Sequence, residues 1–367
     1  MFLSSISFFL FFLGAAVLTA ALMPGVRSFA LRLGVIDRPE LAPDRKIHRS
    51  PTPLLGGIAI FLAFFVCVFF AYALGVNFQQ SAIQEKHLIG IFIGATLLMI
   101  GGFLDDRYHL SPARQFIFPF CAVIVVIASG IGIAYITHPF GGQIMLDGWQ
   151  AVVLWFHKIP YRVTFPADLF TLVWLLGMMY TMKFLDGLDG LASGMTVIGA
   201  LVVALLALDP VVGQPATALL AFILAGSFFG FLPWNWNPAK IFLGEGGSLL
   251  AGFLLGTLAI ISGSKVTTTA LVVGIPILDT AWVILRRIIA ERHSPFLGDR
   301  RHLHHRLLDL GLSQRAVVGL LYFFAAYFGV TALFLQSRGK LLALMILSAI
   351  MLILGVWLVY TRIAKRW

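Results

Sequence analysis

The sequence predicts an all-α polytopic membrane protein, a bundle of about 11 transmembrane helices. Hydrophobic residues make up 60% of its 367 residues and charged residues only 11%, whereas a typical soluble chain is about one quarter charged. The mean hydropathy is +0.96. Apolar runs long enough to cross the hydrocarbon core as helices recur from one end of the chain to the other. These observations exclude an ordinary soluble domain.

The apolar runs predict where each span begins and ends, to within a few residues. The expected spans are residues 2–23, 54–76, 88–104, 115–137, 167–182, 191–208, 216–233, 247–262, 267–285, 316–336 and 341–360. The fifth and eighth are short. Because the connections between spans are short as well, residues 1–367 are expected to form a single transmembrane domain.

The first span is expected to remain part of the protein. Residues 1–23 carry no charge, and a signal peptide would need a positive stretch before its apolar stretch. Cys67 and Cys121 both lie inside apolar runs. We therefore expect them to be packing residues, with neither a disulfide nor a thiolate metal site.

The orientation follows from the Lys and Arg residues. Twenty of them fall on one side of the predicted spans and six on the other, and the richer side is the cytoplasmic one. The N-terminus is then outside and the C-terminus cytoplasmic. Because this asymmetry accounts for the net charge of +10, nucleic acid is not an expected partner.

The longest outer connection runs from residue 138 to residue 166. It contains Gly141-Gly142, Asp147-Gly148 and β-branched residues near Val163. This pattern predicts a small external hairpin or an interfacial segment.

Acidic residues gather on the predicted cytoplasmic side. Asp105 and Asp106 directly follow an apolar run, and Asp186 and Asp189 lie in the glycine-rich segment FLDGLDGLASG, where a tight turn can aim both carboxylates inward. Charges at the membrane edge are unfavourable unless paired, hydrated or bound to metal. A divalent cation, a shared proton or a salt bridge to Arg107 would each relieve the repulsion between Asp105 and Asp106.

Basic residues on the same side are candidate phosphate ligands. Lys46 and His48 precede the glycine pair Gly56-Gly57, which permits close backbone approach. Lys183 lies three residues before Asp186, where it can neutralise that carboxylate or reach a phosphate. These features indicate a site for anionic substrates.

Two further loops complete the candidate site. The segment NWNPAKIFLGEGGS carries Asn237 and Glu245 among glycines that can present backbone N–H groups to an anion. The last cytoplasmic loop carries histidines among arginines, which suits a pyrophosphate better than zinc. On a helix His302 and His305 would share a face, with His304 pointing elsewhere. The candidate phosphate ligands in this loop are Arg301, His302, His304 and His305. Asp279, inside a span, is expected to pair with a nearby polar group.

Five ordered segments together resemble the polyprenyl-phosphate N-acetylhexosamine-1-phosphate transferases, glycosyltransferase family 4. They are SPTPLLGGIAIF, GFLDDR, FLDGLDGLASG, NPAKIFLGEGGSL and GDRRHLHHRL. The resemblance covers residues 46–306. The spacing of the histidines in HLHH resembles the branch that handles UDP-GlcNAc-type donors, the undecaprenyl-phosphate GlcNAc-1-phosphate transferases.

The resemblance implies a catalytic domain that transfers a sugar 1-phosphate from a UDP-sugar to undecaprenyl phosphate at the cytoplasmic membrane face. UMP is released, and a cell-envelope glycan such as lipopolysaccharide O-antigen or teichoic acid is begun. Asp105, Asp106, Asp186 and Asp189 would be the catalytic carboxylates, and Glu245 with Asp186 would hold Mg²⁺, with Mn²⁺ as the alternative. Lys46, Lys183 and the histidine–arginine loop would bind the donor phosphates.

The chain departs from the family pattern at two positions. Lys183 stands where an Asn is usual, and Glu245 stands where a metal-binding Asp is usual. An ammonium has no lone pair to offer a metal, so one expected ligand is replaced. A GalNAc, modified-hexosamine or MurNAc-pentapeptide donor stays open, as does a homodimer. The rival class is a transporter, which would place ionisable groups along a path through the bilayer midplane.

Overall fold

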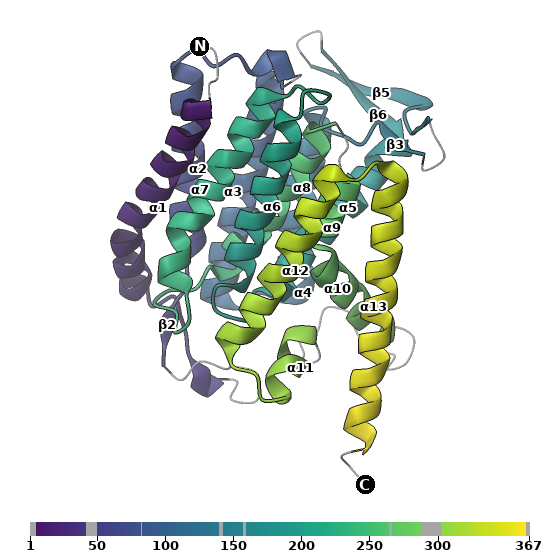
Figure 1. The fold of residues 1–367 in the computed structure, drawn as a ribbon. Coiled ribbons are helices and arrows are strands. Elements are labelled where there is room, and N and C mark those ends of the chain that lie inside the picture. The colour runs from purple at the N-terminus through teal and green to yellow at the C-terminus, as the bar shows by residue number, and fades with distance from the viewer. Residues whose placement is uncertain are drawn as a thin grey trace.

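The computed structural model describes residues 5–41, 50–81, 83–138, 142–156, 159–263, 266–287 and 302–364. These residues form a bundle of long helices with short antiparallel ribbons at its ends (Figure 1). The helices are α1 Ser5–Leu33, α2 Gly56–Ala73, α3 Glu85–Tyr108, α4 Pro112–Ala128, α5 Ala167–Leu185, α6 Leu191–Leu208, α7 Pro215–Asn235, α8 Gly244–Ile261, α9 Val266–Val272, α10 Gly274–Arg286, α11 Leu303–Asp309, α12 Gln314–Phe334 and α13 Ser337–Ala364. The strands are β1 Ile36–Asp37, β2 Thr52–Pro53, β3 Tyr135–Thr137, β4 Gln143–Met145, β5 Trp149–Phe156 and β6 Ile159–Phe165.

Every predicted span contains a helix. Within the described ranges, eight helices are long and apolar enough to cross a membrane, or nine if α9 and α10 count as one broken span. The all-α polytopic class is therefore confirmed, whereas the number of 11 crossings stays a prediction. Helix α1 begins at the end of the bundle that carries β5 and β6, and α13 ends at the opposite end (Figure 1).

Two predicted spans differ from the observed helices. The run 115–137 is helical only to Ala128, because Gly130 adopts a φ of +95° and the chain then extends into β3. The run 267–285 is broken into α9 and α10, which meet at an angle of 83°. Pro276 lies just inside α10, and a straight helix would bring its ring against the carbonyl of residue 272.

The predicted hairpin near residues 138–166 is present as β5 and β6, which pair from Trp149 with Phe165 to Phe156 with Ile159. A second ribbon joins β3 to β4 just before it. Both ribbons lie at the same end of the bundle (Figure 1).

Helix α8 is the centre of the bundle. It packs on α2, α3, α5, α6, α7 and α9, and 89% of its 18 residues are buried. Glu245 lies in the first turn of α8, and the helices packed on α8 bring their own polar ends to the same place. The position of the site therefore follows from the packing of α8.

Glycine pairs let the backbones around the start of α8 touch. A Cβ on Gly102 would lie 2.1 Å from the backbone nitrogen of Gly246, and a Cβ on Gly57 would lie 2.4 Å from Cα of Gly247. Real Cβ atoms are not found at such distances, so α2 and α3 can pack on α8 only without side chains here. The close approach predicted for the pair Gly56-Gly57 is confirmed.

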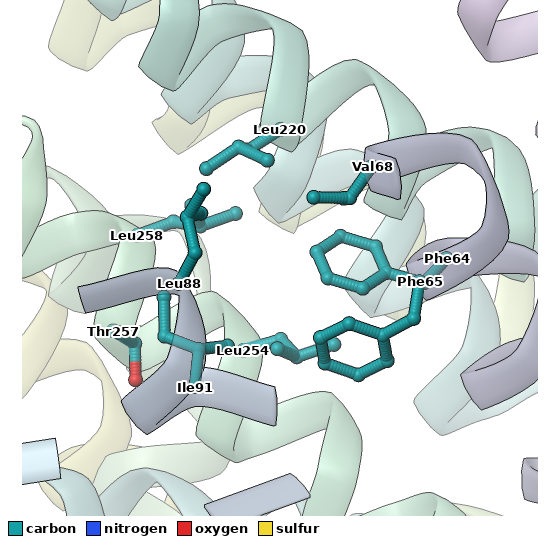
Figure 2. A pocket seen from close by; sticks show the side chains of 9 residues that line it. All are labelled: Phe64, Phe65, Val68, Leu88, Ile91, Leu220, Leu254, Thr257 and Leu258. Carbon is teal, nitrogen blue, oxygen red and sulfur yellow. The ribbon is translucent and has the colours of Figure 1, made fainter. Parts of the chain in front are cut away.

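A small cavity of about 30 Å³ lies among α2, α3, α7 and α8, away from the polar end of the bundle. Figure 2 shows its apolar lining, in which the hydroxyl of Thr257 is the one oxygen among the labelled side chains. An ordered water needs two or more polar partners. This cavity therefore belongs to the apolar interior and not to the functional site.

Candidate active site

Most of the predicted site residues meet at one end of the bundle, where α3, α5 and α10 end and α8 and α11 begin. Lys46, His48 and Arg301 lie outside the described residues. The others are described, and their contacts divide them into an acidic centre, a histidine cluster and a supporting network.

Asp105 and Asp106 point to different partners, although they are adjacent. Both carboxylate oxygens of Asp106 accept the backbone N–H of Glu245, at 3.1 and 3.2 Å. Asp105 Oδ1 instead accepts the backbone N–H of Leu110, at 2.9 Å. Neither carboxylate is paired with Arg107 among the described residues. In this structure the backbone N–H of Glu245 at the glycine-rich start of α8 is occupied by the carboxylate of Asp106, and the binding of a substrate anion there stays a prediction.

Lys183 and Glu245 form the central ion pair. Lys183 Nζ lies 2.5 Å from Glu245 Oε1, and the two side chains are only 19% and 14% exposed. Lys183 also donates to Gln115 Oε1 at 3.1 Å, and the amide nitrogen of Gln115 donates to Asp105 Oδ1 at 2.9 Å. Gln115 therefore joins the lysine to the first aspartate.

Asp186 caps the C-terminus of α5, and the predicted tight turn is confirmed between α5 and α6. Burial, followed by the negative charges of Glu245, Asp106 and Asp189, raises the pKa of the Asp186 carboxyl well above its usual range. A cation beside Asp186 would relieve this repulsion.

Asp189 belongs to the supporting network. Its Oδ2 accepts Asn237 Nδ2 at 2.8 Å and the backbone N–H of Ala239 at 3.1 Å. Asn237 Nδ2 also donates to Gln314 Oε1 at 2.8 Å. The two bonds use both N–H groups of the Asn237 amide. These bonds tie the turn after α5 to the loop before α8.

The histidines form one cluster, and the prediction that His304 points away from the others is wrong. The ring centroids of His304 and His305 are 4.3 Å apart, and the His302 ring is almost parallel to that of His304 at 5.7 Å. Helix α11 begins only at Leu303, and His302 is its extended N-cap. Helical spacing therefore does not place the His302 side chain.

The histidine cluster packs against the turn between α5 and α6, which carries Asp186 and Asp189. A Cβ on Gly187 would be 2.8 Å from His304 Nε2 and 3.3 Å from His305 Nε2. Burial, then the neighbouring His305 and His302, lowers the pKa of His304 well below its usual range. His304 is therefore neutral at pH 7, and its buried Nε2 has no hydrogen-bond partner in the described part of the chain.

Asp279 holds the cluster in place. Its Oδ2 lies 2.8 Å from His302 Nδ1, and its Oδ1 accepts the backbone N–H of Leu303 at 2.9 Å. The expectation that Asp279 pairs with a polar group is thus confirmed. A transporter was favoured mainly by Asp279, as an ionisable residue inside a span. Because Asp279 is bonded to the histidine cluster at the end of the bundle, it no longer supports a transporter.

Asp279→Asn is expected to lower the turnover supported by this site about tenfold or more. Asparagine can still accept from Leu303, but it loses the charge that orients His302, and small displacements of such groups have large kinetic effects. Asp309→Asn, an exposed change at the end of α11, is the control. Equal turnover of the two variants in a membrane assay would remove Asp279 from the site.

Gln115 and Asp279 are functional candidates that motif reasoning did not assign. Both are polar residues inside predicted apolar spans, and this is the signal that could have found them. Their partners, Lys183 and His302, are distant in the chain, so no local pattern connects them.

The chemistry of the site suits hard cations and phosphates. Within the described residues, no three acidic or histidine side chains stand close enough to hold a metal ion by themselves. Mg²⁺ is commonly held by one or two carboxylates together with substrate phosphates. Asp186 and Glu245, whose charges repel each other, fit this two-carboxylate arrangement.

Comparison with known proteins agrees with this chemistry. Residues 88–263 match the model of glycosyl transferase family 4. The chain is 30% identical over 339 residues to the probable undecaprenyl-phosphate N-acetylglucosaminyl 1-phosphate transferase of Bacillus subtilis (strain 168), covering 91% of this chain and 86% of the relative. It is 31% identical over 356 residues to the decaprenyl-phosphate N-acetylglucosaminephosphotransferase of Mycobacterium tuberculosis (strain CDC 1551 / Oshkosh), covering 89% and 82%.

A further relative has a different named activity. The phospho-N-acetylmuramoyl-pentapeptide-transferase of Desulforamulus reducens (strain ATCC BAA-1160 / DSM 100696 / MI-1) is 30% identical over 317 residues, covering 83% of this chain and 87% of the relative. All three names describe transfer of a phosphorylated sugar unit, and two of them name a polyprenyl phosphate. The chain therefore belongs to glycosyl transferase family 4, is a membrane-bound polyprenyl-phosphate sugar-1-phosphate transferase, and falls with the N-acetylglucosamine 1-phosphate branch of that family.

Proposed function

We propose that this enzyme transfers N-acetylglucosamine 1-phosphate from UDP-N-acetylglucosamine to undecaprenyl phosphate and releases UMP. The observation that carries the proposal is the meeting of a carboxylate group, a lysine and a histidine cluster at one end of an apolar bundle. Two anionic substrates can react only where their charges are neutralised. The names of the relatives with N-acetylglucosamine activity support the choice of sugar.

The reaction exchanges one phosphate bond for another. An oxygen of the lipid phosphate attacks the phosphorus that carries the sugar, a new P–O–P bond forms, and the bond to UMP breaks, so that UMP leaves as an anion. Asp105 or Asp106 positions the lipid phosphate or accepts its proton. Lys183 and the histidine cluster bind the donor phosphates, and Lys46, His48 and Arg301 are proposed to join them. Asp189 is proposed as a further catalytic carboxylate and Asn237 as a substrate ligand, and the hydrogen bond between them holds the two loops in register.

Mg²⁺, or Mn²⁺ in its place, would be held by Glu245 and Asp186 and would neutralise charge on the pyrophosphate. The oxygen-only donor set and the repulsion at Asp186 support this assignment. Removal of the metal with a chelator is therefore expected to stop transfer, and added Mg²⁺ should restore it.

We place the site at the cytoplasmic face of the inner membrane, within one catalytic domain of residues 1–367. Two observations support this orientation. The first is the excess of Lys and Arg on that side. The second is that α11, which carries the histidines of the site, lies at the end of the bundle where α13 finishes (Figure 1). A UDP-sugar does not cross a bilayer. Inverted vesicles should therefore use added donor, and sealed right-side-out vesicles should not.

The test of the site uses membranes with labelled UDP-N-acetylglucosamine and undecaprenyl phosphate. Asp105→Asn and Glu245→Gln are each expected to lower transfer at least about 100-fold. An amide in place of Asp105 cannot accept a proton from the lipid phosphate, and an amide in place of Glu245 is a much weaker ligand for a divalent cation. Asp309→Asn should behave as wild type. Full transfer by both site variants would refute the assignment.

A MurNAc-pentapeptide donor is the second candidate, because the relative from Desulforamulus reducens has that named activity. A panel of UDP-sugars with the purified enzyme separates the two. Product from UDP-MurNAc-pentapeptide alone would exclude the N-acetylglucosamine proposal.

A further inference from the structure

The two positions that depart from the family pattern touch each other. Lys183 Nζ and Glu245 Oε1 are 2.5 Å apart, although they come from the last turn of α5 and the first turn of α8. An Asn and an Asp at these positions would be shorter side chains, and the Asn would carry no charge. Compared with the Asn and Asp that the resemblance implies, the lysine adds one positive charge and the glutamate adds none, so Lys183 and Glu245 together are neutral where Asn and Asp would carry a charge of −1.

This ion pair is well enclosed, which makes its partners depend on each other. Both side chains are less than one fifth exposed. Removal of one member of such a pair leaves the other as an uncompensated charge. Glu245 can therefore give up Lys183 only when another cation takes its place, and Lys183 can leave only for another anion.

Lys183 is arranged to reach such an anion. An ammonium has three N–H donors, and its described acceptors are Glu245 and Gln115. Its charge also lies 5.6 Å from the centre of the Tyr180 ring, which is a weak interaction that restricts the side chain without occupying a donor. One donor is left for a phosphate oxygen.

We propose that Lys183 exchanges counter-ions. It holds Glu245 in the structure described here and moves onto a phosphate of the bound uridine nucleotide, so that Glu245 becomes available to a divalent cation only when nucleotide is bound. This inference rests on the proposed function. A phosphate can draw the ammonium away because it offers a charge-assisted bond to the same donors. The exchange makes nucleotide and cation bind cooperatively, and by linkage the effect is reciprocal.

The experiment measures binding and not turnover. The full-length enzyme in detergent is titrated with Mn²⁺, followed by its electron paramagnetic resonance signal, with and without saturating UMP. In the wild type, UMP should tighten Mn²⁺ binding by about tenfold or more. In Lys183→Met, Mn²⁺ alone should bind more tightly than to the wild type, and UMP should tighten Mn²⁺ binding several-fold less than it does in the wild type, because only the direct contact between phosphate and cation remains.

Lys240→Met is the matched control. Lys240 is a lysine at the same end of the bundle whose ammonium lies 5.6 Å from the Trp234 ring centre, and among the described residues it has no carboxylate partner. This variant should keep the wild-type cooperativity. If Lys183→Met does not fold, the double variant Lys183→Asn/Glu245→Asp replaces it. This variant removes the lysine and shortens the carboxylate, and UMP should tighten its Mn²⁺ binding several-fold less than it does in the wild type.

The outcomes separate the inference from the function on which it rests. A wild type that binds Mn²⁺ independently of UMP, or a Lys183→Met variant that keeps the full effect of UMP, would overturn the exchange while the transferase assignment stands. A wild type that binds neither Mn²⁺ nor UMP would overturn both.

Discussion

Gly102→Ala should destabilise the protein by about 3 kcal/mol or more and abolish most of its activity. The added Cβ would lie 2.1 Å from N and 2.2 Å from Cα of Gly246, and backbone atoms of two packed helices cannot move aside as a flexible side chain can. Helices α3 and α8 must then separate. This separation would break the bonds from Glu245 N to Asp106.

The measurement is the Tm of the detergent-solubilised enzyme, together with transfer in membranes. Gly177→Ala is the control, because nothing lies within 4 Å of a Cβ at this helical position, and alanine favours a helix over glycine. It should leave the Tm equal or higher. An unchanged Tm in Gly102→Ala would mean that the two helices do not approach as described.

Asp186→Asn is expected to lower transfer at least about 100-fold and at the same time to raise the Tm of the metal-free enzyme. Burial and the charges of Glu245, Asp106 and Asp189 raise the pKa of this carboxyl. A raised folded-state pKa adds stability that is complete below the unfolded pKa, about 3.9, and is lost as the pH rises through the folded value. The charged carboxylate therefore costs stability while it serves the reaction.

The sign of this effect gives a pH test. The Tm difference between Asp186→Asn and the wild type, measured with a chelator present, should widen as the pH rises through the raised pKa. Transfer by the wild type should increase over the same pH range, because the carboxylate is the active form. Asp189→Asn is the contrast: it weakens two bonds to Asn237 and Ala239 and should lower the Tm. A Tm difference for Asp186→Asn that narrows with pH would contradict the account.

Much of the fold could be predicted because the hydrocarbon core of a membrane allows few backbone structures. A segment in hydrocarbon must satisfy its own backbone groups, so long apolar runs become helices, and each predicted run contains one. The predicted spans differ from the observed helices where glycine or proline interrupts an apolar run. After Ala128 the chain leaves the helix at Gly130, and near Gly274 a proline and a glycine break the span.

The site was predictable in its parts but not in its pairings. Sequence reasoning could name the carboxylates, the histidines and Lys183, because ionisable groups at the membrane edge are unfavourable unless they are paired, hydrated or bound to a ligand. Their partners come from distant segments: Glu245 binds Lys183, and Asp279 binds His302. The direction of His304 was misjudged because the position where α11 starts decides it.

From the sequence alone, one learns that this protein is a membrane-embedded helical bundle, with its reactive groups on the side rich in Lys and Arg and a likeness to a transferase family. These conclusions need only composition, length and order, which the chain carries locally. Which carboxylate faces which cation is decided by tertiary structure. Glycine contacts of α2 and α3 with α8 set the spacing of the helix ends that brings Glu245 to Lys183.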